Sequence, residues 1–222
     1  MIVQQSHPVT LIGGAEVNNQ GLERALALAP GIVAADGGAD AALIHGVTPD
    51  AVIGDFDSIS ESARDVIPPT HQHPVADQDS TDFDKCLGNI NAPLIIGVGF
   101  SGARLDHQLA AFNTLVRHPT QRCVLMGDLD LAFLCPPSLR LDLPTGTALS
   151  LFPMGAVEGI SDGLHWPIAG LNFAPDGRVG TSNRTTGPVF LTMTAPKMLV
   201  ILPHDTLEAV AGALLETVSS WD

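Results

Sequence analysis

The chain has 222 residues, a hydrophobic fraction of 45% and a formal net charge of −14, with only two lysines, Lys85 and Lys197. This length allows one large domain or two small ones, and the hydrophobic fraction excludes a disordered chain. The negative charge argues against a nucleic-acid or an anionic-membrane partner, and no apolar run is long enough to span a membrane.

Short apolar runs alternate with helical patterns in residues 1–138. Strands are predicted at 9–14, 32–35, 51–53, 94–98 and 123–126, and helices at 22–29, 39–45, from 82 and from 105. In the last of these helices we expect a buried stripe of Leu105, Leu109, Phe112 and Val116. Residues 62–76, rich in proline, are interpreted as a loop or broken helix. Such alternation predicts a parallel, Rossmann-like sheet with helices on both faces.

After residue 138 the pattern changes to short apolar runs separated by Gly, Pro and Asp. These runs predict strands at 139–142, 148–152, 157–160, 163–167, 188–194 and 198–202. A helical stripe returns at 206–218. We therefore expect two domains, an α/β domain at 1–138 and a small all-β sandwich or barrel at 139–222 with a C-terminal helix.

Two acidic stretches carry the candidate chemistry. The third predicted strand ends in glycine and is followed by Asp55 and Asp57, which can point the same way because they are two residues apart on an extended chain. The second stretch starts a helix, since Thr81 and Asp84 match the capping pattern and Asp82 lies in the first turn.

Carboxylates from several segments are expected to meet at one sheet edge. Ligands of parallel sheets bind at the carboxyl ends of strands, where Asp36, Asp55 and Asp57 lie. Asp82 and Asp106 begin helices that would reach the same edge. Because so many carboxylates together need a cation, we interpret this edge as a site for Mg²⁺ and phosphate oxygens.

Other interpretations of these residues were weighed. An acidic run is often only a solvated loop, and a calcium loop would need Gly where Asp82 stands. A dinucleotide site is disfavoured because Gly13-Gly14 is followed by Ala15 and Glu16, without the required glycine pattern. Two alternatives stay open: a phosphatase with Asp55 as nucleophile, and a non-catalytic nucleotide or metal sensor.

Five stretches in order resemble the thiamine pyrophosphokinase family over nearly the whole chain. They are 35–39, 53–58, 77–82, 102–107 and 181–183. The resemblance implies transfer of a pyrophosphoryl group from Mg-ATP to the hydroxyl of thiamine, giving thiamine diphosphate and AMP. It also implies a homodimer in which the β domain of one subunit helps to hold thiamine for the other. Two departures are Ala103, where relatives often have Gly, and the C-terminal helix.

The resemblance also implies roles for individual residues. The expected catalytic residues are Asp55, Asp57, Asp82, Arg104 and Asp106, of which Asp55, Asp57 and Asp82 would hold the metal. Asp36, Gly37, Gln78, Thr81 and Arg104 would bind ATP, and Trp166, Thr181, Ser182 and Asn183 would bind thiamine. The Arg104 fork suits phosphate oxygens, and Trp166 is expected to stack on the pyrimidine instead of filling the core.

The three cysteines suggest where the protein resides. Cys86, Cys123 and Cys135 are odd in number and lack metal-ligand spacing, so we interpret them as reduced, buried thiols of a cytoplasmic protein. The N-terminus also lacks the charged and apolar regions of a signal peptide.

Overall fold

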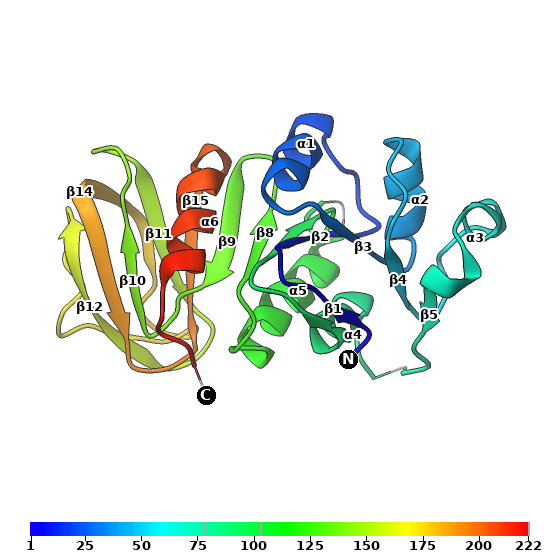
Figure 1. Cartoon of the computed structure of the whole chain (residues 1–222). Helices are drawn as coiled ribbons and strands as arrows, with labels where there is room; N and C mark the ends of the chain where they lie inside the picture. The colour runs from blue at the N-terminus through cyan, green and yellow to red at the C-terminus, as the bar shows by residue number, and fades with distance from the viewer. Residues whose placement is uncertain (78, 103, 222) are drawn as a thin grey trace. The chain divides into compact units, whose positions relative to one another are not determined.

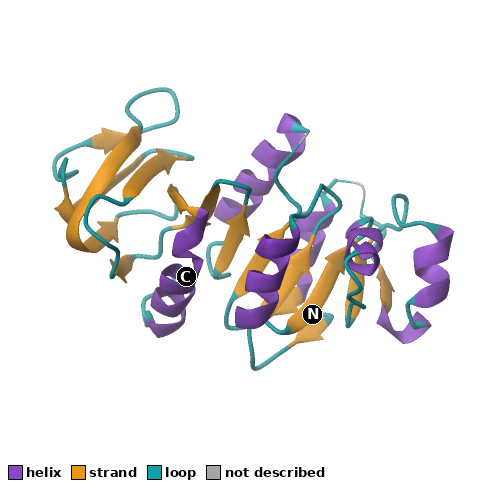
Figure 2. Cartoon of the chain, turned by 90° about the horizontal axis from the view of Figure 1, so that it is seen from above, coloured by secondary structure: helices purple, strands orange, loops and turns teal. Residues whose placement is uncertain are grey.

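The structure is a computed structural model that describes all residues except 78, 103 and 222. The chain forms two compact units: unit 1 comprises 1–114 with 125–128, and unit 2 comprises 115–124 with 129–222. Figure 1 shows the elements of both, and Figure 2 shows that helices alternate with strands in unit 1 while strands predominate in unit 2. Among the described residues, no helix has the length and apolar character needed to cross a membrane.

Unit 1 is built from parallel strand pairs and the helices between them. Strand β2 (Val9–Ile12) pairs in parallel with β7 (Ile95–Val98), and β3 (Gly31–Ala35), β4 (Ala51–Gly54) and β5 (Gln72–Pro74) form a parallel three-stranded sheet. The short strands β1 (Val3–Gln4) and β6 (Ile90–Asn91) are also parallel. Among the predicted strands, parallel pairing is confirmed for β2 with β7 and for β3 with β4, whereas β1, β5 and β6 were not predicted.

The helices of unit 1 follow the predicted order. They are α1 (Asn19–Leu28), α2 (Gly38–Ile44), α3 (Glu61–Val66) and α4 (Asp82–Asn89), and α5 (Leu105–Arg117) begins in this unit. The prediction of a loop or broken helix at 62–76 is only partly right, because α3 and the short 3₁₀ helix η1 (Pro69–His71) lead directly into β5. That strand has few apolar residues, so its sequence gave no alternation signal.

The predicted buried stripe of α5 is wrong at its start. Leu105 and Leu109 are 67% and 56% exposed, whereas Ala111, Leu115 and Val116 are buried. The buried face of the helix is thus restricted to its second half and includes Thr114, whose hydroxyl donates to the Ala110 carbonyl within the helix. The periodicity was right in spacing, but it could not show which turns have a neighbour to pack against.

Unit 2 is an antiparallel arrangement. Its strands are β9 (Asp130–Leu134), β10 (Ser138–Leu141), β11 (Ala148–Pro153), β12 (Val157–Leu164), β13 (Asn172–Phe173), β14 (Gly180–Met193) and β15 (Met198–Pro203). The long β14 pairs with β10, β11 and β12, and β15 lies between β11 and β9. The run predicted at 157–160 and the first two residues of the run predicted at 163–167 belong to one strand, β12, with an irregular register after Asp162, while 165–167 lie beyond its end.

The C-terminal part of unit 2 packs on its own strands. After β15 come the 3₁₀ helix η2 (His204–Thr206) and α6 (Leu207–Glu216). The strand β8 (Cys123–Met126) is divided between the units, with its first two residues in unit 2 and its last two in unit 1. Beyond α6, the Thr217 carbonyl accepts from Arg122 Nη2 at 2.6 Å, Ser219 Oγ donates to the Ser138 carbonyl at 2.7 Å, and Trp221 Nε1 donates to the Cys135 carbonyl at 2.9 Å.

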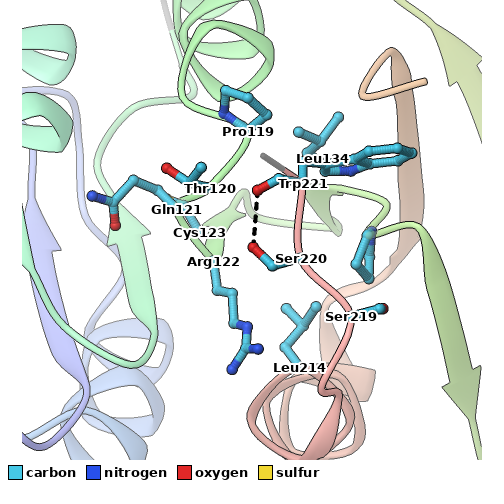
Figure 3. A pocket seen from close by; sticks show the side chains of 11 residues that line it. Pro119, Thr120, Gln121, Arg122, Cys123, Leu134, Leu214, Ser219, Ser220 and Trp221 are labelled. Atoms are coloured by element: carbon cyan, nitrogen blue, oxygen red, sulfur yellow. Dashed lines mark hydrogen bonds between the residues drawn. The ribbon is translucent and has the colours of Figure 1, made fainter.

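A small pocket lies beside this C-terminal segment (Figure 3). It is lined by residues of 119–123 together with Leu134, Pro136, Leu214 and 219–221. Its volume of about 20 Å³ suits a single water molecule. This pocket is therefore too small to hold a nucleotide or thiamine.

Candidate functional site

Asp55 and Asp57 directly follow β4, as predicted. Between them Phe56 adopts φ of 67°, a left-handed conformation that is uncommon for a bulky side chain. Its ring packs on a buried cluster of Ala34, Ala39, Val52, Ile59, Ala63 and Ile67, with the guanidinium of Arg64 5.4 Å from the ring centre. Apolar packing of Phe56 thus anchors the turn, and the carboxylates on either side of it make polar contacts with Lys85 and with Ser58.

Asp36 directly follows the neighbouring strand β3 and is almost completely buried, with 1% exposure. Its carboxylate accepts from the backbone N–H groups of Ser58 at 3.3 Å and Ile59 at 3.0 Å, so that it ties the end of β3 to the loop after β4. Gly54 allows this approach, because a Cβ at that position would lie only 2.6 Å from the Asp36 Cβ. The observed position of the Asp36 side chain therefore requires glycine at residue 54 in the adjacent strand.

These three aspartates form one acidic triad. A carboxylate oxygen of Asp36, one of Asp55 and one of Asp57 all lie within 4.8 Å of one another. Burial, together with the nearby charges of Asp82 and Asp57, raises the pKa of Asp36 to about 6 although two backbone N–H groups act in the opposite direction. Three converging carboxylate oxygens are the ligands that a hard divalent cation such as Mg²⁺ prefers, so the residues present fit such an ion.

Helix α4 supplies the second acidic stretch. The hydroxyl of Thr81 accepts from the Asp84 backbone N–H at 3.3 Å, which confirms the predicted cap. Asp82 lies in the first turn, but it is not part of the triad that the structure defines; its Oδ1 accepts from Lys85 Nζ at 3.0 Å. Asp82 was expected to be a metal ligand, and that role stays a prediction.

Lys85 is a functional candidate that the sequence interpretation missed. Its Nζ donates to Asp55 Oδ2 at 2.6 Å as well as to Asp82, and its side chain is 2% exposed. The hydrogen bond from Lys85 holds the pKa of Asp55 below its usual value. Burial alone would lower the pKa of Lys85, but its two carboxylate partners outweigh that effect and raise it. The available signal was its position three residues after Asp82, one helical turn away.

Arg104 and Asp106 lie at the start of α5 and are exposed. Arg104 Nη2 donates to Asp106 Oδ2 at 2.6 Å, and each side chain is 66% exposed. This pairing raises the pKa of Arg104 and lowers that of Asp106. An exposed guanidinium is accessible to phosphate oxygens. Gly37 lies at the N-terminal end of α2, and a Cβ at this position would lie 3.3 Å from the Ser58 Cβ. Gln78 and Ala103 lie outside the described residues.

The residues expected to bind thiamine lie together in unit 2. Asn183 on β14 is buried and forms a reciprocal pair with Trp166: its Oδ1 accepts from the Trp166 backbone N–H at 3.1 Å, and its Nδ2 donates to the Trp166 carbonyl at 2.7 Å. Ser182 adopts φ of 65°, and its N–H donates to Ser150 Oγ. Thr181 precedes it and is exposed.

The Trp166 side chain is 54% exposed, so it is not a core residue. The His165 ring meets its indole edge to face at 4.4 Å, and the guanidinium of Arg184 lies 5.7 Å from the ring centre. Because the Asn183 side chain binds both the backbone N–H and the carbonyl of Trp166, the exposed indole is mounted on a fixed support. Such a mounting suits a ring that stacks on a flat ligand.

Comparisons with known proteins agree on one family. Residues 22–127 match the family model for the catalytic domain of thiamin pyrophosphokinase. Thiamine pyrophosphokinase 2 of Arabidopsis thaliana is 31% identical over 159 residues, which are 61% of this chain and 58% of that protein, and thiamine pyrophosphokinase 1 of Oryza sativa subsp. japonica is 30% identical over the same coverage. The chain therefore spans less than two thirds of the length of the curated relatives it matches.

Solved structures show the same mixed α/β fold. Thiamin pyrophosphokinase from Candida albicans has a TM-score of 0.73 at 18% identity, covering 90% of this chain and 92% of that one. The yeast enzyme has a TM-score of 0.73 at 18% identity, covering 91% and 89%. A protein from Lactobacillus plantarum has a TM-score of 0.74 at 21% identity, covering 89% and 99%. At these identities the structural likeness concerns the fold.

Proposed function

The chain belongs to the thiamine pyrophosphokinase family, and from that membership we propose that it transfers the pyrophosphoryl group of Mg-ATP to the hydroxyl of thiamine. The products are thiamine diphosphate and AMP. The observation that carries the proposal is the acidic triad of Asp36, Asp55 and Asp57, whose carboxylate oxygens converge within 4.8 Å inside the region that matches the catalytic-domain model.

The chemistry assigned to the triad follows from its charge. In the reaction, the thiamine oxygen forms a bond to the β-phosphorus of ATP, the bond from that phosphorus to the bridging α,β oxygen breaks, and the hydroxyl loses its proton. A Mg²⁺ ion held by Asp36, Asp55 and Asp57 would stabilise negative charge on the phosphoryl oxygens. An aspartate of the cluster is the acceptor for the hydroxyl proton.

The remaining ATP contacts are assigned to neighbouring elements of unit 1. Arg104 presents a planar fork for phosphate oxygens, and its present partner Asp106 leaves both side chains accessible. Gly37 and Thr81 lie at the starts of α2 and α4, and Gln78 is assigned to the phosphates with them. Asp82 and Asp106 complete the proposed catalytic set.

Thiamine recognition is assigned to unit 2. Trp166 offers the exposed aromatic face, and Thr181, Ser182 and Asn183 provide the polar groups beside it. A flat, apolar ring with a positively charged neighbour is suited to an aromatic platform. We further propose a homodimer in which the thiamine-binding residues of one subunit complete the site of the other.

The proposed functions of the chain divide between its two predicted domains. We propose that residues 1–138 form a Rossmann-like catalytic and ATP-binding domain, and that 139–222 form a sandwich or barrel domain for thiamine. A cytoplasmic location is proposed as well, supported by the three buried cysteines, Cys86, Cys123 and Cys135, which are all free thiols.

One assay tests the proposed activity. The protein is incubated with ATP, Mg²⁺ and thiamine, and AMP and thiamine diphosphate are quantified together. Equal amounts of the two products are expected, and AMP formation should stop when thiamine is omitted. Release of phosphate from simple phosphoesters without ATP would instead indicate a phosphatase, and ATP binding without any turnover would indicate a sensor.

A further inference from the structure

A second carboxylate near the start of α2 holds the loop that follows β4. Asp40 lies in the first turn of α2, four residues after Asp36. Its Oδ2 accepts from the Ser60 backbone N–H at 2.9 Å, and its Oδ1 accepts from the Ser60 hydroxyl. Both oxygens of Asp40 are therefore directed at one residue, at the end of the loop opposite to Asp55.

Ser60 is the residue at which this loop becomes helix α3. Its hydroxyl accepts from the Ala63 backbone N–H at 3.1 Å and so caps the helix. A serine cap needs only this contact, and the dipole of α2 favours a carboxylate in its first turn without any further partner. Stabilisation of the two separate helices therefore does not account for the link between Asp40 and Ser60.

Helix α2 is a firm support for this link. A Cβ on Gly38 would lie only 2.1 Å from the Ile12 carbonyl oxygen, and Ala39 is completely buried. The first turn of α2 is thus packed directly against the end of β2. A carboxylate on this turn can fix a neighbouring loop, because closely packed backbone resists displacement.

The loop between β4 and α3 is held at three consecutive residues. Asp36 accepts from the backbone N–H groups of the two residues before Ser60, and Asp40 accepts from Ser60 itself. The hydroxyl of Ser58 in turn donates to Asp57 Oδ1 at 2.7 Å. The exposed Asp57 side chain is therefore placed by hydrogen bonds to a backbone that these two carboxylates hold.

We propose that Asp40 is a positioning residue: it acts through Ser60 and fixes the loop that carries Asp55 and Asp57 in the conformation that the reaction needs. The inference rests on the proposed function, which assigns these two aspartates to the reacting phosphates and their metal. No contact with substrate or metal is assigned to Asp40. Without it the loop is tied to Asp36 alone, and misplaced catalytic groups lower the rate of the chemical step.

The test compares Asp40→Ala with a matched control, Asp50→Ala. Asp50 also accepts from a backbone N–H, that of Ile32 at 2.9 Å, but it precedes β4 and so lies at the end of the strand away from the loop. Both variants should lower the melting temperature. Only Asp40→Ala should lower kcat with Mg-ATP and thiamine, by about tenfold, while the KM for thiamine stays near the wild-type value. Equal kcat in the two variants would overturn the proposal.

A conservative variant separates positioning from a general loss of stability. Asp40→Asn keeps an acceptor for the Ser60 N–H and a polar group for its hydroxyl, so it should recover most of the lost kcat. Failure of this rescue in a folded Asp40→Asn would contradict the role of the hydrogen bonds. If Asp40→Ala does not fold, Ser60→Ala decides, because it removes the hydroxyl donor: kcat must fall at an unchanged thiamine KM, and a wild-type kcat overturns the proposal.

Two readouts that need no turnover keep this proposal separable from the proposed function. In a titration with Mn²⁺ alone, followed by the electron paramagnetic resonance signal of the free ion, Asp40→Ala should bind more weakly than wild type and Asp50→Ala should not. Amide hydrogen exchange at residues 55–60 needs neither metal nor substrate, and it should be faster in Asp40→Ala only. A wild-type protein without turnover or Mn²⁺ binding would overturn the proposed function, whereas unchanged exchange at 55–60 in Asp40→Ala would overturn the positioning role.

Discussion

At the scale of single residues, the site combines groups that the sequence could identify with groups that it could not. Asp55 and Asp57 follow from the glycine-ended strand, and the Thr81 cap follows from its spacing. The left-handed conformation of Phe56 and the ion pairs of Lys85 depend on tertiary packing and on a partner 30 residues away. Local sequence patterns carry no information of that kind.

Asp57→Asn tests whether this carboxylate serves chemistry instead of the fold. Asp57 is exposed, and its Oδ1 accepts from the Ser58 hydroxyl at 2.7 Å, a contact that Asn can keep. We expect turnover to fall at least about 100-fold with the melting temperature unchanged or slightly higher. The matched control is Asp142→Asn, an exposed aspartate paired with Arg140, which should keep full activity. Near-wild-type turnover in Asp57→Asn would contradict the assignment.

The raised pKa of Asp36 predicts a pH dependence of stability in the absence of metal. Because its pKa is about 6 in the folded protein and 3.8 as the reference value, the folded state binds the proton more tightly. The associated stability is present below pH 3.8 and is lost as pH rises through 6. The loss above pH 7 is on the order of 3 kcal/mol.

The measurement is urea denaturation of wild type and Asp36→Asn in EDTA at pH 5 and pH 7.5. Between these values wild type should lose about 1 kcal/mol more of its unfolding free energy than the variant. Asn can replace only one of the two acceptor oxygens that Ser58 and Ile59 use, so the variant should differ in stability from wild type at both pH values. The test is therefore whether the difference in unfolding free energy between the two proteins changes from pH 5 to pH 7.5. Parallel pH profiles would show that Asp36 is not the titrating group.

At the scale of elements, periodicity predicted the type and order of helices and strands better than it predicted which of their residues are exposed. The helical spacing in α5 was right, but Leu105 and Leu109 are exposed because nothing in the described unit covers that part of the helix. Strand β14 runs from Gly180 to Met193, far beyond the apolar run that indicated it. Its polar first half, which includes Ser182 and Asn183, pairs with β11, and pairing partners are not visible in one strand's sequence.

Gly54→Ala tests the close approach of β3 and β4. The added Cβ would lie 2.6 Å from the Asp36 Cβ, so Asp36 must move. We expect a loss of about 1–3 kcal/mol of unfolding free energy and weaker Mn²⁺ binding. Gly212→Ala in α6 is the matched control, since its Cβ meets nothing within 4 Å and should be neutral or stabilising. Equal stability of the two variants would show that β4 tolerates the side chain.

At the scale of the whole molecule, the residues proposed to bind ATP and those proposed to bind thiamine belong to different compact units, and the family match covers only residues 22–127. The order of motifs in the sequence was sufficient to indicate the family. The sequence of one chain does not specify whether a site is completed by the same chain or by a second copy. That question concerns surfaces that meet only on assembly.

Subunit exchange tests the shared site. Asp55→Asn and Trp166→Ala are each expected to be nearly inactive under limiting thiamine, and their subunits are then allowed to mix. About half of the dimers should be mixed, and each of these carries one site with both residues intact, so about a quarter of all sites should recover. If each site is built from one chain, no activity returns after verified exchange.

The two tryptophans differ sharply in their surroundings, and this has an optical consequence. The Trp166 indole is largely open to water, whereas the Trp221 ring is partly buried and its N–H is bound to the Cys135 carbonyl. A soluble collisional quencher should therefore extinguish the red-shifted emission of Trp166 first and leave a bluer remainder from Trp221. Since the chain contains no tyrosine, these two indoles dominate its ultraviolet emission. If Trp166 binds a flat ligand as proposed, the red-shifted emission should change when the ligand binds, while the bluer emission of Trp221 should change when the C-terminal segment detaches.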